Sequence, residues 1–251
     1  MNRLVIIGNG FDLAHGIHTS YKDFINWYWE QRILELRSVY SKLSEDKLCR
    51  LINFRNEWHL FAFNNSYFHG KDLLEIKDMI EECNGDFSVN KFTLFDRITK
   101  NIETKGWTDI ESDYYELLKE NSNDIEKCKS LNEQLDFTRE KLAKYLVTIE
   151  QPEVIAAVKQ ALKEPILMDD VSTLEIQRKL EQWKDISESE CIKVEDTSDI
   201  PYNYVAHTML LSFNYTPTAE MYLDETTHIN YIHGSLDKPN EMIFGYGDEM
   251  D

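Results

Sequence analysis

Two side chains near the C-terminus combine a residue type and a position that could do acid–base chemistry. His233 directly follows the apolar segment 229–232, and Asn214 directly follows the apolar segment 207–213. An imidazole, whose ordinary pKa is about 6.5, can take up and return a proton at neutral pH. A carboxamide can hold a water molecule or a ribose hydroxyl. The pair therefore predicts a catalytic site, with His233 as the base and Asn214 as the residue that positions water.

Both residues also have a structural interpretation. A histidine at the end of a strand can be held by the core, and an asparagine often ends a strand in an Asx-turn. Ser235 completes the segment His-Gly-Ser, and Ser212 and Thr216 flank Asn214 as further hydrogen-bonding residues. The shared position after an apolar segment favours a functional site.

A loop near the N-terminus contains the residues that could hold an anion. The apolar residues Leu4–Ile7 run into Gly8 and Gly10, a pattern typical of a buried parallel strand that ends in a glycine turn. We expect a wrapped loop from Gly8 to His18, in which the N–H groups of residues 8–12 face a phosphate-type anion. The predicted ligand-binding residues of this loop are Gly8, Asn9, Gly10, Phe11, Asp12 and Gly16.

The spacing of this loop separates it from the common dinucleotide motif. Gly16 lies six residues after Gly10, so the segment does not match Gly-x-Gly-x-x-Gly. Asp12 would repel a phosphate, and we expect it to accept hydrogen bonds from ribose hydroxyls or to cap a short turn. Thr19 or Ser20 is predicted to cap the helix that follows.

Strands that end on polar or small residues are predicted in the last fifty residues, at 207–213, 229–232 and 242–244. Ligands of open α/β sheets lie outside the carboxyl ends of the strands, so Gly8, Asn214, His233 and Gly245 are expected to meet at one edge. The predicted fold is α/β, with a Rossmann-like, mostly parallel sheet and a large α-helical insertion.

The predicted sheet domain comprises residues 1–40 and 201–251, and the helical insertion comprises residues 41–200. Apolar residues at helical spacing occur in three stretches, 131–149, 154–162 and 174–183. The acidic, serine-rich stretch at 185–200 is expected to be a solvated linker.

The segment Gly106–Glu111 also contains carboxylates. Thr108 or Asp109 is expected to cap a helix, with the acidic residues at its positive end. The alternative, in which Asp109 or Glu111 serves as a second carboxylate in the cleft, is less favoured.

Composition and charge exclude several classes of protein. The chain has 251 residues and a net charge of −19, which disfavours nucleic acid as a partner. Its apolar runs fall well short of the ~20 residues of a membrane helix, and it shows no signal-peptide pattern, so we expect a cytoplasmic protein without a membrane partner. The four cysteines lie at least 34 residues apart, and we assign neither a disulfide nor a metal site.

Taken in order, several motifs resemble those of the AbiH family of bacteriophage abortive-infection proteins. They are the segments 6–16, 106–111, 212–216, 231–236 and 244–249. The resemblance implies a role in phage defence, with a phage or host protein as the trigger. Family members continue past the last motif with a further strand and helices, which implies that this chain is cut short.

Three of these motifs are also distantly similar to sirtuins and SIR2-like NAD hydrolases. Gly8–Ile17 is similar to the opening loop of those proteins, Phe213–Thr216 to their asparagine motifs, and Ile232–Ser235 to Leu-His-Gly-Ser. The similarity implies NAD as ligand or substrate and hydrolysis of its nicotinamide–ribose bond, with Asn214 and His233 as the catalytic residues. The zinc module of sirtuins is absent, which argues against protein deacylation.

Two other functions stay open. A non-enzymatic sensor would bind a nucleotide in the same pocket and contact a phage or host protein through the acidic helical insertion. A nuclease would need a carboxylate cluster for Mg²⁺, which only the segment 107–111 suggests.

Overall fold

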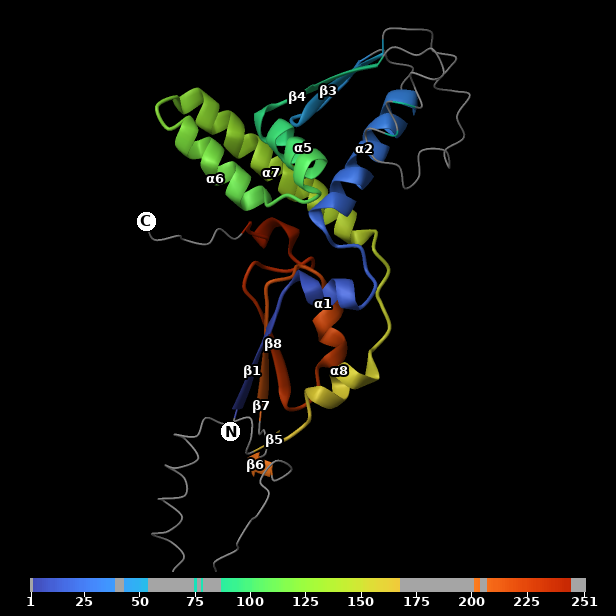
Figure 1. The fold of residues 1–251 in the computed structure, drawn as a ribbon, viewed down its shortest axis with the longest axis vertical. Helices are drawn as coiled ribbons and strands as arrows, with labels where there is room; N and C mark the ends of the chain where they lie inside the picture. The colour runs from blue at the N-terminus through green and yellow to red at the C-terminus, as the bar shows by residue number, and fades with distance from the viewer. Residues whose placement is uncertain are drawn as a thin grey trace, which may run out of the picture. The chain divides into compact units, whose positions relative to one another are not determined.

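The computed structural model describes residues 2–38, 43–53, 75, 78, 87–167, 201–203 and 207–244. The chain is a mixed α/β protein that divides into two compact units (Figure 1). The first unit comprises residues 1–8, 152–213 and 217–232, and the second comprises residues 9–151, 214–216 and 233–251.

A parallel sheet of three strands forms the centre of the first unit (Figure 1). Its strands are β1 (Asn2–Ile7), β7 (His207–Ser212) and β8 (Thr227–Tyr231), in the order β1-β7-β8. Both pairings are parallel, with Leu4 opposite Met209 and Met209 opposite His228. The prediction of a parallel sheet built from the two ends of the chain is thereby confirmed.

The two faces of this sheet differ in burial. Thr208, Leu210 and Ser212 point to one face and are buried, because side chains of a strand alternate between faces. On the other face, Leu4 is 60% exposed and Ile6 is 69% exposed. The expectation that Leu4–Ile7 is buried on both faces is therefore wrong for the described residues.

The covered face lies against short elements of the same unit. The 3₁₀ helix η3 (Pro217–Tyr222) contributes the buried Ala219 and Tyr222, and it contacts β8. Tyr222 Oη accepts a hydrogen bond from the backbone N–H of Ile155, at the start of helix α8 (Ala156–Ala161). Helix α8 corresponds to the predicted helix at 154–162.

The guanidinium of Arg3 caps the end of α8. Its Nη1 donates to the carbonyls of Ala161 and Leu162, at 2.9 and 2.8 Å, and its Nη2 donates to that of Glu164, at 2.6 Å. These carbonyls lack partners within the helix, and a cation there also favours the helix dipole. A short antiparallel pair, β5 (Ile166–Leu167) with β6 (Pro201–Asn203), lies in the same unit.

The second unit is mostly helical, as predicted for this zone of the chain. Its helices are α1 (Asn9–Ala14), α2 (Tyr21–Ser38), α5 (Thr93–Lys105), α6 (Ile110–Glu120) and α7 (Ile125–Val147). Helix α7, which covers most of the predicted stretch 131–149, packs against α2, α5 and α6. The centre of this core is aromatic, with Phe24, Tyr28, Trp29 and Phe95 fully buried.

An antiparallel sheet interrupts the predicted helical insertion. Its strands β2 (Leu43–Glu45), β3 (Cys49–Asn53) and β4 (Phe87–Lys91) follow the order β2-β3-β4. Leu48 and Leu51 bury their side chains in the helical core. The zone that the sequence predicts to be mostly helical therefore also contains a sheet, at 43–53 and 87–91.

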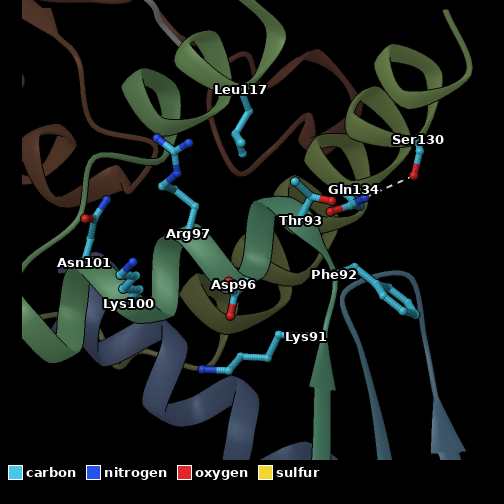
Figure 2. A pocket seen from close by; sticks show the side chains of 10 residues that line it. All are labelled: Lys91, Phe92, Thr93, Asp96, Arg97, Lys100, Asn101, Leu117, Ser130 and Gln134. Carbon is cyan, nitrogen blue, oxygen red and sulfur yellow. Dashed lines mark hydrogen bonds between the residues drawn. The ribbon is translucent and has the colours of Figure 1, made fainter. Parts of the chain in front are cut away.

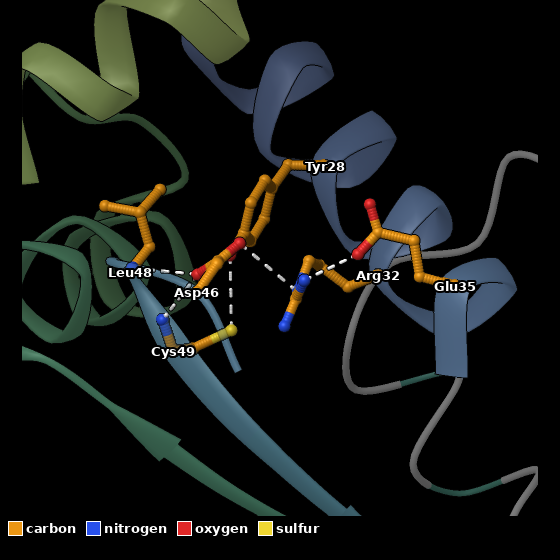
Figure 3. A network of polar contacts seen from close by, with 6 residues as sticks. All are labelled: Tyr28, Arg32, Glu35, Asp46, Leu48 and Cys49. Carbon is orange, nitrogen blue, oxygen red and sulfur yellow. Dashed lines mark hydrogen bonds and ion pairs between the residues drawn. The ribbon is translucent and has the colours of Figure 1, made fainter. Parts of the chain in front are cut away.

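A polar network joins α2 to the turn between β2 and β3 (Figure 3). Tyr28 Oη lies 2.9 and 3.0 Å from the two carboxylate oxygens of Asp46 and 3.2 Å from Cys49 Sγ. Arg32 Nε forms an ion pair with Asp46 at 3.3 Å. Burial raises the pKa of the Cys49 thiol to about 11, so this cysteine is a neutral structural residue at pH 7.

Helix N-termini are capped where the sequence indicates. Ser20 Oγ accepts from the N–H of Asp23 at 3.1 Å, in the first turn of α2. The Asp109 side chain accepts from the N–H of Ser112 at 3.0 Å, in the first turn of α6. The capping roles predicted for Ser20 and Asp109 are confirmed.

The predicted strand at 242–244 is wrong. The 3₁₀ helix η4 (Pro239–Glu241) is followed by irregular chain, whose backbone groups bind elsewhere. The carbonyl of Met242 accepts from Arg139 Nη1 at 3.1 Å, and that of Ile243 accepts from Tyr215 Oη at 2.9 Å. Side chains therefore donate to these carbonyls in place of the backbone N–H groups that a neighbouring strand would supply.

The boundaries predicted at residues 40 and 200, the linker at 185–200 and the helix at 174–183 lie outside the described residues and stay predictions. Within the described part of the chain, no helix combines the length and the apolar character that crossing a membrane requires.

Candidate functional site

The carboxyl ends of the three parallel strands are aligned by backbone hydrogen bonds. The N–H of Phe213 donates to the carbonyl of Ile7 at 2.9 Å, and the N–H of Ile232 donates to that of Ser212 at 2.8 Å. The residues that come next along the chain are Gly8, Asn214 and His233. These three predicted site residues therefore follow strand ends that share one edge of the sheet.

Two of these three residues belong to the second unit, together with the remaining predicted site residues. That unit contains Asn214, His233 and Ser235 as well as residues 9–16, whereas Gly8 ends the first unit. Gly245, also expected at this edge, lies outside the described residues.

The segment after Gly8 is a helix, so the expected wrapped loop is wrong. Helix α1 contains Gly10, Phe11 and Asp12, and Gly16 follows it with a φ of +75°. Asn9 Oδ1, at the start of α1, accepts from Thr19 Oγ1 at 2.6 Å. This hydrogen bond joins the first residue of α1 to the residues that precede α2.

The ligand-free fold does not require a glycine at position 8 or at position 10. A Cβ placed on Gly8 or Gly10 would meet no atom within 4 Å, and neither residue has a positive φ. A glycine inside a helix costs about 1 kcal/mol relative to alanine, and the ligand-free fold gives Gly10 nothing in return. The open space above both glycines is what a closely bound ligand would need.

Gly234, in contrast, is required by the fold. Its φ is +81°, and a Cβ there would lie 2.7 Å from the carbonyl oxygen of Glu241. The glycine lets the chain turn directly after His233, whose carbonyl accepts from the N–H of Ile243 at 2.9 Å.

Asp12 connects α1 to the segment that follows β7. Its Oδ2 accepts a hydrogen bond from Thr216 Oγ1 at 2.5 Å, and the residue is only 1% exposed. Its Oδ1 has no hydrogen-bond partner among the described residues. The expected contact of Asp12 with ribose hydroxyls stays a prediction. In this arrangement the carboxylate is shielded from solvent, so a ligand could reach it only after a movement of the surrounding chain.

His233 lies beside Tyr215. The centroids of the two rings are 6.3 Å apart, and the backbone carbonyl of Tyr215 accepts from the N–H of Leu236 at 3.0 Å. Burial lowers the pKa of His233 below its usual value, which leaves the imidazole neutral and able to accept a proton at pH 7. Asn214, directly before Tyr215, is 8% exposed.

Glu111 is the residue of this region that the sequence places at a helix terminus, with a role as a second carboxylate in the cleft as the less favoured alternative. It lies in the first turn of α6, where its Oε1 accepts from Tyr21 Oη at 2.6 Å. Burial raises the pKa of the Glu111 carboxyl to about 7. The pKa of Tyr215 is also raised, by burial and by the charge of Glu111. The second unit therefore contains a glutamate whose pKa is raised to about 7, Glu111, and a histidine whose pKa is lowered by burial, His233.

A hollow of about 900 Å³ in this unit lies elsewhere, among α5, α6 and α7 (Figure 2). Its basic residues include Lys91, Arg97 and Lys100. Arg97 is neutralised by Glu116 at 3.0 Å and by Glu120 at 2.8 Å. No predicted site residue lines this groove, and we assign it no role in the site.

Among the described residues, no group of three histidine, cysteine or acidic side chains is arranged to hold a metal ion. The polar groups that the second unit does gather are suited to proton transfer and to hydroxyl binding. They are Asp12, Glu111, Asn214, Tyr215, Thr216 and His233.

The fold and site define an α/β protein in which the residues that follow parallel strands contribute to a polar, partly buried site. A family model described as "Bacteriophage abortive infection AbiH" matches residues 4–251 of the chain. The chain therefore belongs to the AbiH family, as its motifs indicated, and family membership implies a role in phage abortive infection. Comparison with curated proteins and with solved structures gives no match.

Proposed function

We propose that this abortive-infection protein binds NAD and hydrolyses the bond between nicotinamide and ribose. The observation that carries the proposal is the position of Asn214 and His233, each the second residue after a strand whose carboxyl end is aligned with that of its neighbour. The order of three motifs that are similar to those of SIR2-like NAD hydrolases supports it. The Rossmann-like, SIR2-like nature of the sheet is part of the same proposal, and the parallel order β1-β7-β8 favours it.

The chain offers residues for each part of NAD. The N–H groups of Asn9 and Gly10 would face the diphosphate, since Gly10 leaves open space around its Cα atom. Phe11 and Ser235 would contact the nucleoside, and Gly16 allows the turn between α1 and α2. Asp12 would direct its free Oδ1 to a ribose hydroxyl once α1 moves.

The proposed reaction breaks the bond between ribose C1′ and the nicotinamide nitrogen. The bonding electrons leave with nicotinamide, and the ribose acquires oxocarbenium character. A water held by Asn214 attacks C1′, and neutral His233 accepts the proton of that water. The products are nicotinamide and ADP-ribose. General-base catalysis contributes about 10²–10⁴ to such a rate, and positioning contributes more.

Consumption of NAD by substituted proteins tests this assignment. We expect His233→Ala and Asn214→Ala each to lower the rate of nicotinamide release by about 100-fold or more. His228→Ala is the matched control, because His228 is an exposed histidine on β8 and should leave the rate unchanged. Equal rates for the wild type and His233→Ala would contradict the proposal.

A non-enzymatic sensor is the second candidate, and the burial of Asp12 and Asn214 favours it. Neither side chain faces solvent freely, so ligand entry would have to move α1 or the segment 214–216. Such a movement could be passed to a phage or host protein. Calorimetric binding of NAD without release of nicotinamide would support the sensor over the hydrolase.

A further inference from the structure

We propose that Glu111 is a positioning residue of the site, whose negative charge stabilises the positive charge that develops next to His233. This inference rests on the proposed hydrolysis of NAD and adds to it a residue that neither the motif similarity nor the family assigns. It stands on the hydrogen bond between Glu111 and Tyr21 and on the ring contact between Tyr215 and His233, all in the second unit.

Two capped helices fix the Glu111 carboxyl. Tyr21 is the first residue of α2 and Glu111 the second residue of α6, and the hydrogen bond between them is 2.6 Å long. Ser20 and Asp109 cap these helices at their N-termini. The carboxyl is therefore held by two rigid elements rather than by a loop, as a residue with a geometric role requires.

Tyr215 is a neighbour of His233, and burial and the charge of Glu111 raise the pKa of the Tyr215 hydroxyl. The centroids of the Tyr215 and His233 rings are 6.3 Å apart. The same hydroxyl donates to the carbonyl of Ile243 at 2.9 Å, which fixes the ring. The Tyr21 ring contacts Phe244 at 6.4 Å, so the segment that starts at His233 returns to the Glu111–Tyr21 pair.

The surroundings of Glu111 are poorly suited to a purely structural carboxylate. Within the described ranges, Glu111 forms no ion pair with a basic side chain. The titratable groups that face it are Tyr21 from α2, Tyr215 from the segment after β7, and Asp109 from its own helix, none of which is cationic. A glutamine could accept from Tyr21 equally well without the cost of burying a charge. Such an arrangement is typical of functional sites.

The charge of Glu111 would act at the step in which nicotinamide leaves. Positive charge then spreads over the ribose ring, and His233 becomes an imidazolium when it takes the proton of the attacking water. An ionised Glu111 stabilises both cations, whereas a protonated Glu111 does not. Because burial lowers the pKa of His233 and raises that of Glu111, Glu111 ionises at the higher pH and sets the acidic limb.

The pH dependence of kcat/KM for NAD tests the inference, with four proteins compared between pH 5.5 and 9. For the wild type, we expect kcat/KM to rise with pH and to level off above a midpoint of about 7. Glu111→Gln should lose this limb and reach a plateau about tenfold lower. Tyr21→Phe should move the limb to higher pH, because the hydrogen bond from Tyr21 lowers the pKa of Glu111. Glu116→Gln, on the same helix and paired with Arg97, should match the wild type.

A ¹³C NMR titration of the Glu111 carboxyl, assigned by its loss in Glu111→Gln, gives a readout without turnover. A midpoint near 7 that rises in Tyr21→Phe is expected, and a midpoint near the ordinary 4.5 would overturn the inference. Persistence of the limb near pH 7 in Glu111→Gln would also overturn it while leaving NAD hydrolysis intact. If the wild type released no nicotinamide at any pH, the proposed function would fail, and the role of Glu111 with it.

Discussion

Thr216 donates a hydrogen bond of 2.5 Å to the buried carboxylate of Asp12, which lies 204 positions earlier in the chain. This contact joins the first helix of the chain to the segment that follows β7. The same segment contains Asn214 and Tyr215, so the contact fixes the candidate site as well as the fold. The residues that could bind a ligand and those that hold α1 are therefore partly the same.

Loss of this hydrogen bond should lower the stability of the protein. Thr216→Val removes the donor to Oδ2 of Asp12, so that neither oxygen of this buried carboxylate keeps a hydrogen-bond partner among the described residues. We expect the free energy of unfolding to fall by about 1–3 kcal/mol in urea denaturation. Thr104→Val, which changes an exposed threonine of α5, should alter it by less than about 0.5 kcal/mol. Equal stability of the two variants would show that Thr216 does not hold α1.

Gly234→Ala should be more destabilising than Gly106→Ala, although both glycines have a positive φ. The added Cβ at position 234 would lie 2.7 Å from a backbone carbonyl oxygen, whereas the one at position 106 would meet nothing within 4 Å. Strain at a positive φ costs on the order of 1 kcal/mol, and the steric conflict adds to it only at Gly234. Thermal unfolding of the two variants measures this difference, and similar melting temperatures would argue against a close approach of Glu241 to Gly234.

Gly10→Ala should separate the needs of the fold from those of the ligand. Alanine fits α1 without contact and is the better helix former, so the free energy of unfolding should rise by about 0.5–1 kcal/mol. If the diphosphate of NAD approaches this backbone, the added methyl should weaken NAD binding about tenfold or more in calorimetry. A variant that is more stable and binds NAD as tightly as the wild type would place the ligand elsewhere.

Glu111 should make the stability of the protein depend on pH. Because its folded pKa of about 7 lies above the ordinary value of 4.5, the folded chain holds the proton more tightly than the unfolded chain. This contribution is fully present below pH 4.5 and is lost as the pH rises through 7. Glu111→Gln should therefore exceed the wild type in free energy of unfolding at pH 8, by on the order of 2 kcal/mol, and by less at pH 5. A constant difference between the two pH values would contradict the raised pKa.

Apolar runs and helical spacing in the sequence predicted the three parallel strands and helix α7. β1 contains the continuous apolar run Leu4–Ile7, β7 and β8 mix apolar with polar residues, and α7 has apolar residues at helical spacing. Each of these elements appears near its predicted bounds. Helix α1 was not predicted, because Gly10 lowers its intrinsic helix propensity and the contact of Asp12 with Thr216 is not local. The strand expected at 242–244 is absent for a similar reason. The side chains of Arg139 and Tyr215, which are distant in the sequence, donate hydrogen bonds to its backbone carbonyls.

The candidate site was predictable as far as single residues at strand ends are concerned. Asn214 and His233 follow strands, and the alignment of those strand ends follows from the parallel pairing. A role for Glu111 in the cleft was the less favoured alternative, because its capping neighbour Asp109 gives the acidic segment a complete local explanation. Only the hydrogen bond from Tyr21, 90 positions earlier in the chain, shows that the Glu111 carboxyl also has a partner outside its own helix.

The central claim is that NAD binds to the second unit at α1 and at the segments that contain Asn214 and His233. Hydrogen exchange measured with and without NAD tests this claim most directly. The account predicts that NAD slows exchange together in the peptides that cover residues 9–16, 214–216 and 233–236. The peptide that covers α5, which lines the groove of about 900 Å³, should be unaffected. Protection confined to that groove, or no protection at a saturating concentration of NAD, would contradict the account.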